Sequence, residues 1–149
     1  MPITGLFEGL SYGYAKCCHP VPGDPIVGIV TSGKGVTIHT QDCPTLSQYT
    51  DEPERWIDVS WDKSALPDSA LPVRIKVTLS DQSASMPELM TILAQQGAKL
   101  SNLTTQRRGG GWIDLTVDID VRDKDHLDTI LQALRSSERI SSVSRVKAG

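Results

Sequence analysis

Residues 113–121 read Ile-Asp-Leu-Thr-Val-Asp-Ile-Asp-Val, so apolar and polar side chains alternate without a break. Successive side chains of a β-strand point to opposite faces of a sheet, and this period of two therefore predicts a strand with one buried face. Residues 73–79, Val-Arg-Ile-Lys-Val-Thr-Leu, repeat the pattern. Two such strands predict an antiparallel sheet that is covered on one side only.

Helical patterns accompany these strands. Ser85 and Glu88 have the spacing of a capping box, and Gly97 supplies the left-handed conformation in which helices often end. The apolar stripe between them consists of Leu89, Ile92 and Leu93. Asp123 is the predicted N-cap of a second helix, whose stripe consists of Leu127, Ile130, Leu131 and Leu134.

Two further strands are predicted at residues 100–107 and 140–146, with a glycine-rich turn at residues 108–111. The order of elements over residues 73–149 is then β-α-β-β-α-β, which predicts an α+β domain of the ferredoxin-like type. The preceding residues 66–72 contain two prolines and small side chains without periodicity, and they are the predicted linker.

Residues 1–65 predict a small β-rich module that contains all three cysteines. Strands are expected at residues 26–31, 36–39 and 56–61, and a short helix at residues 42–49. Because this module has few large aliphatic side chains, its core is marginal without a staple such as a metal ion.

The composition excludes several classes of protein. The 149 residues carry a formal net charge of −3, and residues 1–65 hold 4 Lys and Arg against 8 Asp and Glu, which does not favour a general nucleic-acid binder. No apolar run reaches the roughly 18 residues of a membrane span, and no signal peptide is visible. An odd, small number of cysteines favours a reducing compartment, so we expect a cytoplasmic protein without a membrane segment.

A candidate metal site is formed by Cys17, Cys18, His39 and Cys43. Three thiolates and one imidazole are a common tetrahedral zinc set, and the spacing of four between His39 and Cys43 lets both reach one ion. Adjacent cysteines need a bent backbone to reach the same metal. His19 and Asp42 are alternative ligands, although Pro20 favours an extended His19.

Two other interpretations of these residues stay open. The thiols can be small buried hydrophobic groups beside a hydrogen-bonded histidine. The set can also be a hydrolase site, with Cys17 or Cys18 as nucleophile, His39 as base and Asp42 as orienting group. No oxyanion hole or substrate cleft accompanies it.

Lys16 and Lys34 are candidate contacts to RNA phosphates, which position a protein without reading sequence. The alternative is that both lysines are solvated surface residues. The Gly33-Lys34-Gly35 segment lacks the spacing of a phosphate-binding loop, so a hairpin turn is the better interpretation.

Two stretches together resemble one protein family. YAKCCHPVPGD at residues 14–24, followed by GKGVTIH at 33–39 and DCP at 42–44, resembles the conserved-cysteine module of the RelA/SpoT family of bifunctional (p)ppGpp synthetase/hydrolases. In that family an ACT domain follows this module, and residues 73–149 have the ACT order of elements. The family's hydrolase, synthetase and TGS domains have no counterpart here, so we expect no catalysis in this chain.

The resemblance implies a regulatory role in the stringent response. Family members dock this region on ribosomal RNA, some bind branched-chain amino acids in the ACT domain, and both inputs act on the protein's own catalytic domains. We therefore expect valine or isoleucine to bind, and we expect a homodimer through the ACT sheets because pairing removes an exposed edge.

The expected amino-acid site lies at the interface of two copies. It consists of Ala84, Ser85, Met86, Leu100, Asn102 and Gln106, with Leu100, Asn102 and Gln106 assigned to one face of their strand by the period of two. The family usually has glycine at the position of Ala84. A different hypothesis is a stand-alone amino-acid-binding ACT regulator with a zinc-stapled module.

Overall fold

Strands β7 (Leu71–Ser80) and β9 (Trp112–Val121) form the centre of a four-stranded antiparallel sheet, with β8 (Lys99–Gly109) and β10 (Ile140–Arg145) at its edges. Their strand order is β10-β7-β9-β8. The computed structural model describes residues 2–7, 9–31, 33, 35–67 and 69–148. The predicted α+β fold with the order βαββαβ is confirmed.

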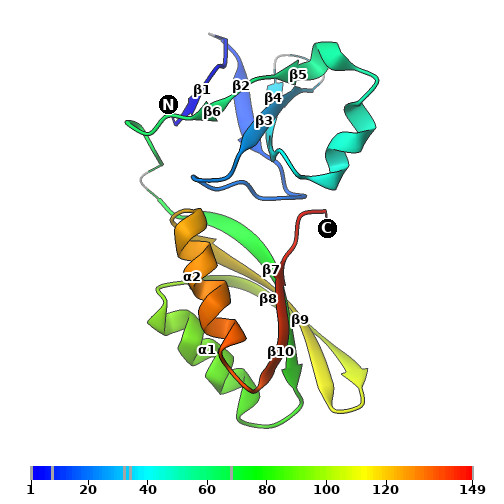
Figure 1. The fold of residues 1–149 in the computed structure, drawn as a ribbon, viewed down its shortest axis with the longest axis vertical. Helices are drawn as coiled ribbons and strands as arrows, with labels where there is room; N and C mark the ends of the chain where they lie inside the picture. Colours follow the sequence, from blue (N-terminus) through cyan, green and yellow to red (C-terminus); the bar gives the residue numbers. More distant parts are fainter. Residues whose placement is uncertain (1, 8, 32, 34, 68, 149) are drawn as a thin grey trace. The chain divides into compact units, whose positions relative to one another are not determined.

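Helices α1 (Ser85–Gln95) and α2 (Lys124–Arg135) lie on the same face of this sheet (Figure 1). The apolar residues of β7 and β9 point towards them. These side chains are all at most 1% exposed: Val73, Ile75, Val77, Leu79, Leu115, Val117, Ile119 and Val121. The opposite face of the sheet carries the polar half of the alternation.

The predicted start of α2 and the predicted end of α1 are both confirmed, but α1 begins differently. Asp123 caps α2, because its carboxylate accepts a hydrogen bond from the amide of His126 at 2.7 Å. Gly97 has φ +70° and follows α1, as predicted. The capping box at Ser85 is wrong: Ala84 is the N-cap, and the Ser85 hydroxyl bonds instead to the hydroxyl of Ser80 at 2.6 Å.

The chain divides into two compact units, one of residues 1–69 with 147–149 and the other of residues 70–146. The boundary falls inside the segment predicted as a linker. Leu71 and Pro72 of that segment already pair with Val121 and Asp120 as the first residues of β7.

The first unit contains a four-stranded sheet of order β2-β4-β3-β5. Strands β3 (Ile26–Val30) and β4 (Gly35–Thr40) form an antiparallel hairpin, β2 (Ser11–Tyr14) pairs with β4 in parallel, and β5 (Trp56–Ile57) pairs with β3. Two 3-10 helices, η1 (Pro44–Tyr49) and η2 (Pro53–Arg55), connect β4 to β5.

The strand predicted over residues 56–61 is divided in two. Its second part, β6 (Ser60–Trp61), leaves the sheet and pairs with β1 (Ile3–Thr4). Gly5, which follows β1, lets the two segments approach closely. It has φ +99°, and a Cβ at this position would lie 2.3 Å from the carbonyl oxygen of Asp58. None of the helices in the described ranges is long and apolar enough to cross a membrane.

Candidate functional site

The adjacent cysteines lie in a tight turn that follows β2. The amide of His19 donates to the carbonyl of Ala15 at 2.9 Å, and the amide of Ala15 donates to the carbonyl of Ile38 on β4 at 2.9 Å. His19 has φ +47°, so the prediction that Pro20 keeps it extended is wrong. This turn supplies the bend that adjacent cysteines need in order to approach one point.

His39 and Cys43 reach the same point from the end of β4. His39 lies on the hairpin strand opposite Val27, and Cys43 follows a turn in which its amide donates to the Thr40 carbonyl at 3.1 Å. Cys43 then precedes η1, which begins at Pro44. The hairpin and the turn together fix the two predicted ligands that are four residues apart.

The four predicted ligands converge. The ligand atoms of Cys17, Cys18, His39 and Cys43 all lie within 4.8 Å of one another. Cys17 Sγ is 3.4 Å from Cys43 Sγ and 3.5 Å from His39 Nδ1, and Cys18 Sγ is 3.9 Å from the same nitrogen.

These spacings fit a tetrahedral ion. Around zinc, bonds of about 2.3 Å to sulfur and 2.0–2.1 Å to nitrogen place two sulfur ligands about 3.8 Å apart and a sulfur and a nitrogen about 3.6 Å apart. Cys18, His39 and Cys43 are buried, and Cys17 is half-buried. The group could therefore hold a metal ion.

Backbone groups surround the sulfur atoms. The amide of Thr40 donates to Cys18 Sγ at 3.3 Å, and Cys43 Sγ donates to the carbonyl of Lys147 at 3.2 Å. The Thr40 side chain is buried beside Cys18 and Asp42, but its hydroxyl oxygen makes no hydrogen bond of normal geometry with any residue in the described ranges. Neither Thr40 nor Lys147 was predicted from the sequence.

Burial and hydrogen bonds shift the pKa values of the ligand set in different directions. Burial raises the pKa of the Cys18 thiol to about 12, although the hydrogen bond from the Thr40 amide opposes the change. It also lowers the pKa of His39, which favours the neutral imidazole that metal ions bind. For Cys43, burial acts upwards, but hydrogen bonds from Thr45 and from the neighbouring thiols leave its pKa below the ordinary value.

The alternative roles of Asp42 are not supported. Its carboxylate bonds to the Lys147 ammonium group at 2.7 Å, which lowers the pKa of Asp42. It makes no hydrogen bond with His39 among the described residues, so the orienting contact that a cysteine hydrolase requires is missing.

The residues predicted for amino-acid binding lie in two places. Ala84 is exposed, Ser85 is buried and Met86 is half-buried at the start of α1. Asn102 and Gln106 are exposed on β8. Within one chain no hydrogen bond between described residues joins the two groups.

A β-bulge separates Leu100 from Asn102. Leu100 pairs with the buried Ile119, whereas Asn102 pairs with Asp118 on the open face of the sheet. The register shifts between the two positions, so Ser101 is the extra residue. The expectation that Leu100 shares a face with Asn102 and Gln106 is therefore wrong, because a strict period of two does not survive a bulge.

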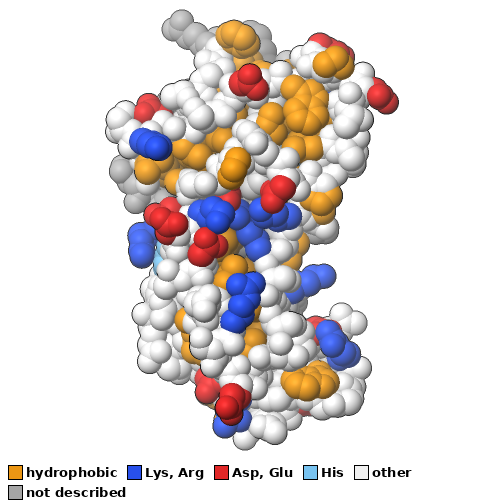
Figure 2. All heavy atoms as spheres, viewed as in Figure 1, with side chains coloured by type: hydrophobic (Ala, Val, Ile, Leu, Met, Phe, Trp, Pro, Cys, Tyr) orange, Lys and Arg blue, Asp and Glu red, His pale blue; other side chains and the backbone are white. Residues whose placement is uncertain are grey.

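Of the two lysines predicted to contact RNA, the structure describes only Lys16. Lys16 is exposed in the turn that holds the cysteines. Lys34 lies outside the described residues. On the face shown in Figure 2, Lys and Arg side chains are interleaved with Asp and Glu side chains.

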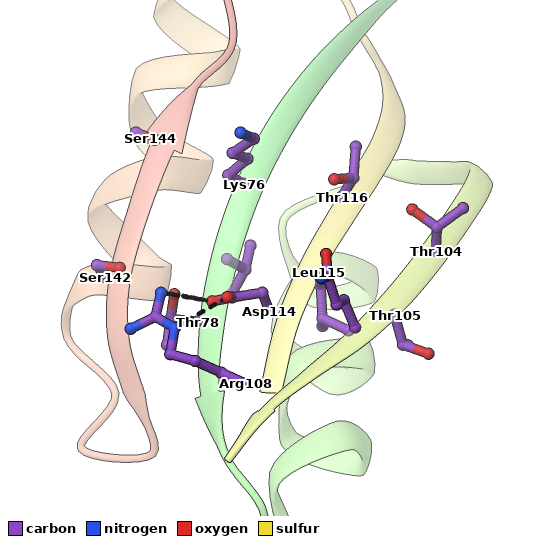
Figure 3. Close-up of a pocket in the computed structure, with 12 residues that line it drawn as sticks. Lys76, Thr78, Thr104, Thr105, Arg108, Asp114, Leu115, Thr116, Ser142 and Ser144 are labelled. Atoms are coloured by element: carbon purple, nitrogen blue, oxygen red, sulfur yellow. Dashed lines mark hydrogen bonds and ion pairs between the residues drawn. The ribbon is translucent and has the colours of Figure 1, made fainter. Parts of the chain in front are cut away.

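The open face of the second unit's sheet forms a polar groove that sequence reasoning did not single out (Figure 3). Its volume is about 610 Å³. Arg108 reaches across it and donates to the two carboxylate oxygens of Asp114 at 2.7 and 2.9 Å, and Thr78 donates to Asp114 at 2.8 Å. The polar positions of β7 and β9 indicated this face, but only the register brings Arg108 to Asp114.

Comparisons with known proteins match both units. The family model of the RelA/SpoT RIS domain matches residues 1–62, and that of the ACT domain matches residues 67–145. The ACT domain of a GTP pyrophosphokinase from Chlorobium tepidum, a crystal structure, is 16% identical; it covers 50% of this chain and 96% of its own, with a TM-score of 0.45.

Similar full-length proteins match nearly the whole chain. "GTP pyrophosphokinase rsh" of Brucella abortus is 39% identical over 146 residues, which are 98% of this chain and 19% of that protein. "Bifunctional (p)ppGpp synthase/hydrolase SpoT" of Escherichia coli is 30% identical over 145 residues, 97% of this chain and 20% of that protein.

The chain thus spans about a fifth of the length of these relatives. The matched domains are the RIS and ACT domains of the C-terminal regulatory region, and no synthetase or hydrolase domain is matched within the 149 residues. This chain belongs to the RelA/SpoT family, whose RIS and ACT domains it carries in tandem.

Proposed function

We propose that this chain regulates a (p)ppGpp synthetase/hydrolase of the bacterial stringent response in the cytoplasm. The RIS unit reports the state of the ribosome, and the ACT domain binds a branched-chain amino acid. Both inputs shift the balance between synthesis and hydrolysis in the catalytic domains of the parent protein. The observation that carries the proposal is the tandem match to the RIS and ACT family models. It is supported by the similarity to relatives named as a GTP pyrophosphokinase and as a bifunctional (p)ppGpp synthase/hydrolase.

The first unit is proposed to contain a structural zinc ion held by Cys17, Cys18, His39 and Cys43. The convergence of the four ligand atoms within 4.8 Å supports it. Zinc would connect β2, the end of β4 and the turn before η1, and so stabilise a core that is small for an independently folded unit. Elemental analysis of protein purified without chelator should give close to one zinc per chain, and Cys43→Ser should reduce that content. A wild-type chain free of zinc would overturn the proposed metal centre.

The amino-acid site is proposed to require two copies of the chain. Residues 81–86 lie at the Arg107 end of β8, where Arg107 forms an ion pair with Asp81. Asn102 is five residues away along β8, a distance of about 17 Å at 3.3–3.4 Å per residue. One amino acid cannot contact both groups within a single chain.

Antiparallel pairing of β8 with the same strand of a second copy removes this separation. If the two-fold axis passes through Thr104, Asn102 of one copy lies opposite Gln106 of the other, next to Arg107 and residues 81–86. Strand β8 is free for this pairing, because it is an edge strand with nearly all of its residues exposed. The start of α1, which has no side-chain cap, can then receive the carboxylate of the ligand.

Calorimetric titration of the folded dimer tests amino-acid binding. Valine and isoleucine should bind more tightly than alanine, because each methylene group contributes about 1–3 kcal/mol in an apolar pocket. Aspartate should not bind. Asn102→Ala should weaken binding without unfolding the domain, and Ser144→Ala on the opposite edge strand is the matched control. The absence of heat with millimolar valine and isoleucine would exclude this ligand class.

Ribosome binding is tested separately through Lys16, which is exposed beside the cysteines. Lys16→Glu should reduce co-sedimentation with ribosomes, because it replaces an attraction to RNA phosphates with a repulsion. Lys63→Glu in the same unit is the matched control for the change of charge. Equal effects of both substitutions would show that Lys16 makes no specific contact.

A further inference from the structure

Thr40 is a buried residue whose hydroxyl group lacks a hydrogen bond of normal geometry to any described residue. Its residue is 1% exposed, and its hydroxyl oxygen has no hydrogen-bond partner of normal geometry in the described part of the chain. Buried polar groups in folded proteins are almost always paired, so an exception of this kind needs a physical explanation.

The position of Thr40 connects this hydroxyl with the metal ligands. The residue follows His39 directly and precedes Cys43 by three positions, and its amide donates to Cys18 Sγ at 3.3 Å. Its hydroxyl lies beside Cys18 and Asp42. One residue therefore brings two donors, an amide and a hydroxyl, to the most buried sulfur of the group, because the Cys18 residue is 0% exposed.

The acceptor strength of that sulfur depends on its protonation. A thiol sulfur is a weak hydrogen-bond acceptor, whereas an ionised group accepts bonds that are shorter and about twice as strong. Metal binding converts Cys18 from thiol to thiolate, because the thiolate is the form that coordinates zinc. The hydroxyl of Thr40 thus lacks a good acceptor in the metal-free chain and gains one when a metal is bound.

We propose that Thr40 is a positioning residue of the metal centre, and that both its amide and its hydroxyl donate to the Cys18 thiolate in the metal-bound state. The inference rests on the proposed zinc site. Hydrogen bonds of this kind orient a ligand and stabilise its charge, and their loss typically weakens metal binding about 10–100-fold.

Asp42 is the competing acceptor for the hydroxyl. Its carboxylate already accepts from the Lys147 ammonium group at 2.7 Å, and its side chain is 65% exposed. Water and Lys147 can therefore satisfy this carboxylate, whereas the buried Cys18 sulfur depends on Thr40. Asp42→Asn leaves the thiolate contact in place and should change zinc affinity much less than a substitution of Thr40.

The test uses Thr40→Val in the full chain, because valine has the shape of threonine and removes only the hydroxyl while keeping the amide. Zinc affinity is measured by competition with a chromophoric chelator. Thr40→Val should bind zinc about tenfold more weakly, and Thr40→Ser should restore the affinity. Thr37→Val makes the same chemical change on the same strand and should leave the affinity unchanged.

Two further readouts separate this role from a general effect on packing. Thr40→Val should raise or preserve the melting temperature of the metal-free chain, because it removes an unpaired buried group, and should lower that of the zinc-loaded chain. In the cobalt-substituted protein, the sulfur-to-metal charge-transfer band should shift to longer wavelength, because the thiolate loses a donor.

Three results would overturn the inference. They are an unchanged zinc affinity in Thr40→Val, an equal loss of stability with and without metal, and a larger effect of Asp42→Asn than of Thr40→Val. Absence of zinc from the wild-type chain is a separate outcome, which would overturn the proposed metal centre itself.

Discussion

At the scale of single residues, Asp114 is a carboxylate that accepts hydrogen bonds from two side chains, those of Arg108 and Thr78. Hydrogen bonds from Arg108 and then from Thr78 hold its pKa below the ordinary value. Since the folded-state pKa is depressed, the contribution to stability is present above the unfolded pKa of about 4 and is lost as the pH falls through the folded value.

We therefore expect the free energy of unfolding of the ACT domain to fall less steeply with decreasing pH in Asp114→Asn than in the wild type. The free energy of unfolding from urea titrations between pH 7 and pH 3 measures the effect. Asp51→Asn, at an exposed turn of the other unit, is the control. Parallel curves for wild type and Asp114→Asn would show that the Arg108 contact does not persist in solution.

The residues of the metal group illustrate what the sequence can and cannot predict. Cys17, Cys18, His39 and Cys43 were identified by residue type and spacing, and the structure brings their ligand atoms together. Thr40 carries no such signal, because its contact to Cys18 is made by a backbone amide. The left-handed His19 also runs against the ordinary effect of a following proline, since the turn from Ala15 overrides it.

At the scale of elements, Gly97 ends α1 in a complete Schellman motif. The amide of Ala98 donates to the Leu93 carbonyl at 2.9 Å, and that of Gly97 donates to the Ala94 carbonyl at 3.1 Å. Space is not the constraint, because the atom nearest to a Cβ added at this position would be 3.8 Å away. The constraint is the left-handed backbone conformation of Gly97, with φ +70°, which residues with a Cβ adopt only at a cost in free energy.

Gly97→Ala should accordingly lower the free energy of unfolding by about 1 kcal/mol. Gly97→Asn should lose less, because asparagine tolerates the left-handed conformation. Both are measured by chemical denaturation of the full chain. A larger loss with asparagine than with alanine would mean that side-chain size, and not backbone conformation, governs the position.

The exposed strand β8 leads to a prediction about assembly. If two copies pair antiparallel with the two-fold axis at Thr104, Thr104→Cys should form a disulfide between copies under mild oxidation. Lys99→Cys, near the end of the same strand, should not. Mass spectrometry of the linked peptides distinguishes this disulfide from any bond formed by the three native cysteines. Light scattering that finds only the 16.2 kDa monomer at micromolar concentration would contradict the dimer.

Elements were predictable where the determinants are local. Alternation gave β7 and β9, and the stripes gave both helices. The failures involve partners outside the helix: Ser85 bonds to Ser80 at the end of β7 rather than capping α1, and the Glu88 carboxylate accepts from Ser137. The bulge at Ser101 and the division of residues 56–61 depend on the neighbouring strands, which no local pattern specifies.

At the scale of the whole molecule, the two units should differ in their response to metal removal. The proposed zinc ligands all belong to the first unit. A ligand present at about 1,000 times its dissociation constant stabilises the folded state by about 4 kcal/mol, so a chelator should shift the melting transition of this unit downwards. The transition of the ACT domain should not move.

Differential scanning calorimetry of the full chain with and without chelator measures both transitions. Cys43→Ser is the matched control, because a chain that no longer holds zinc should show the same trace with and without chelator. Equal shifts of both transitions in the wild type would mean that metal removal destabilises the units together.

The parallel pairing of β2 with β4 has a consequence for the order of events during folding. Strands β3 and β4 are neighbours in the chain and form a hairpin, which closes on a timescale of about 1–10 μs. Ser11 pairs with Gly35, 24 positions later (35 − 11), so β2 must close a longer loop before it gains contacts.

Cys17 and Cys18 follow β2 directly, whereas His39 and Cys43 belong to the end of the hairpin strand and its turn. The hairpin therefore presents two ligands early, and the arrival of β2 delivers the other two. Metal bound first by His39 and Cys43 would capture the incoming thiols and lengthen the lifetime of each encounter. The folding rate of the RIS unit should then increase with zinc concentration, while that of the ACT domain stays constant.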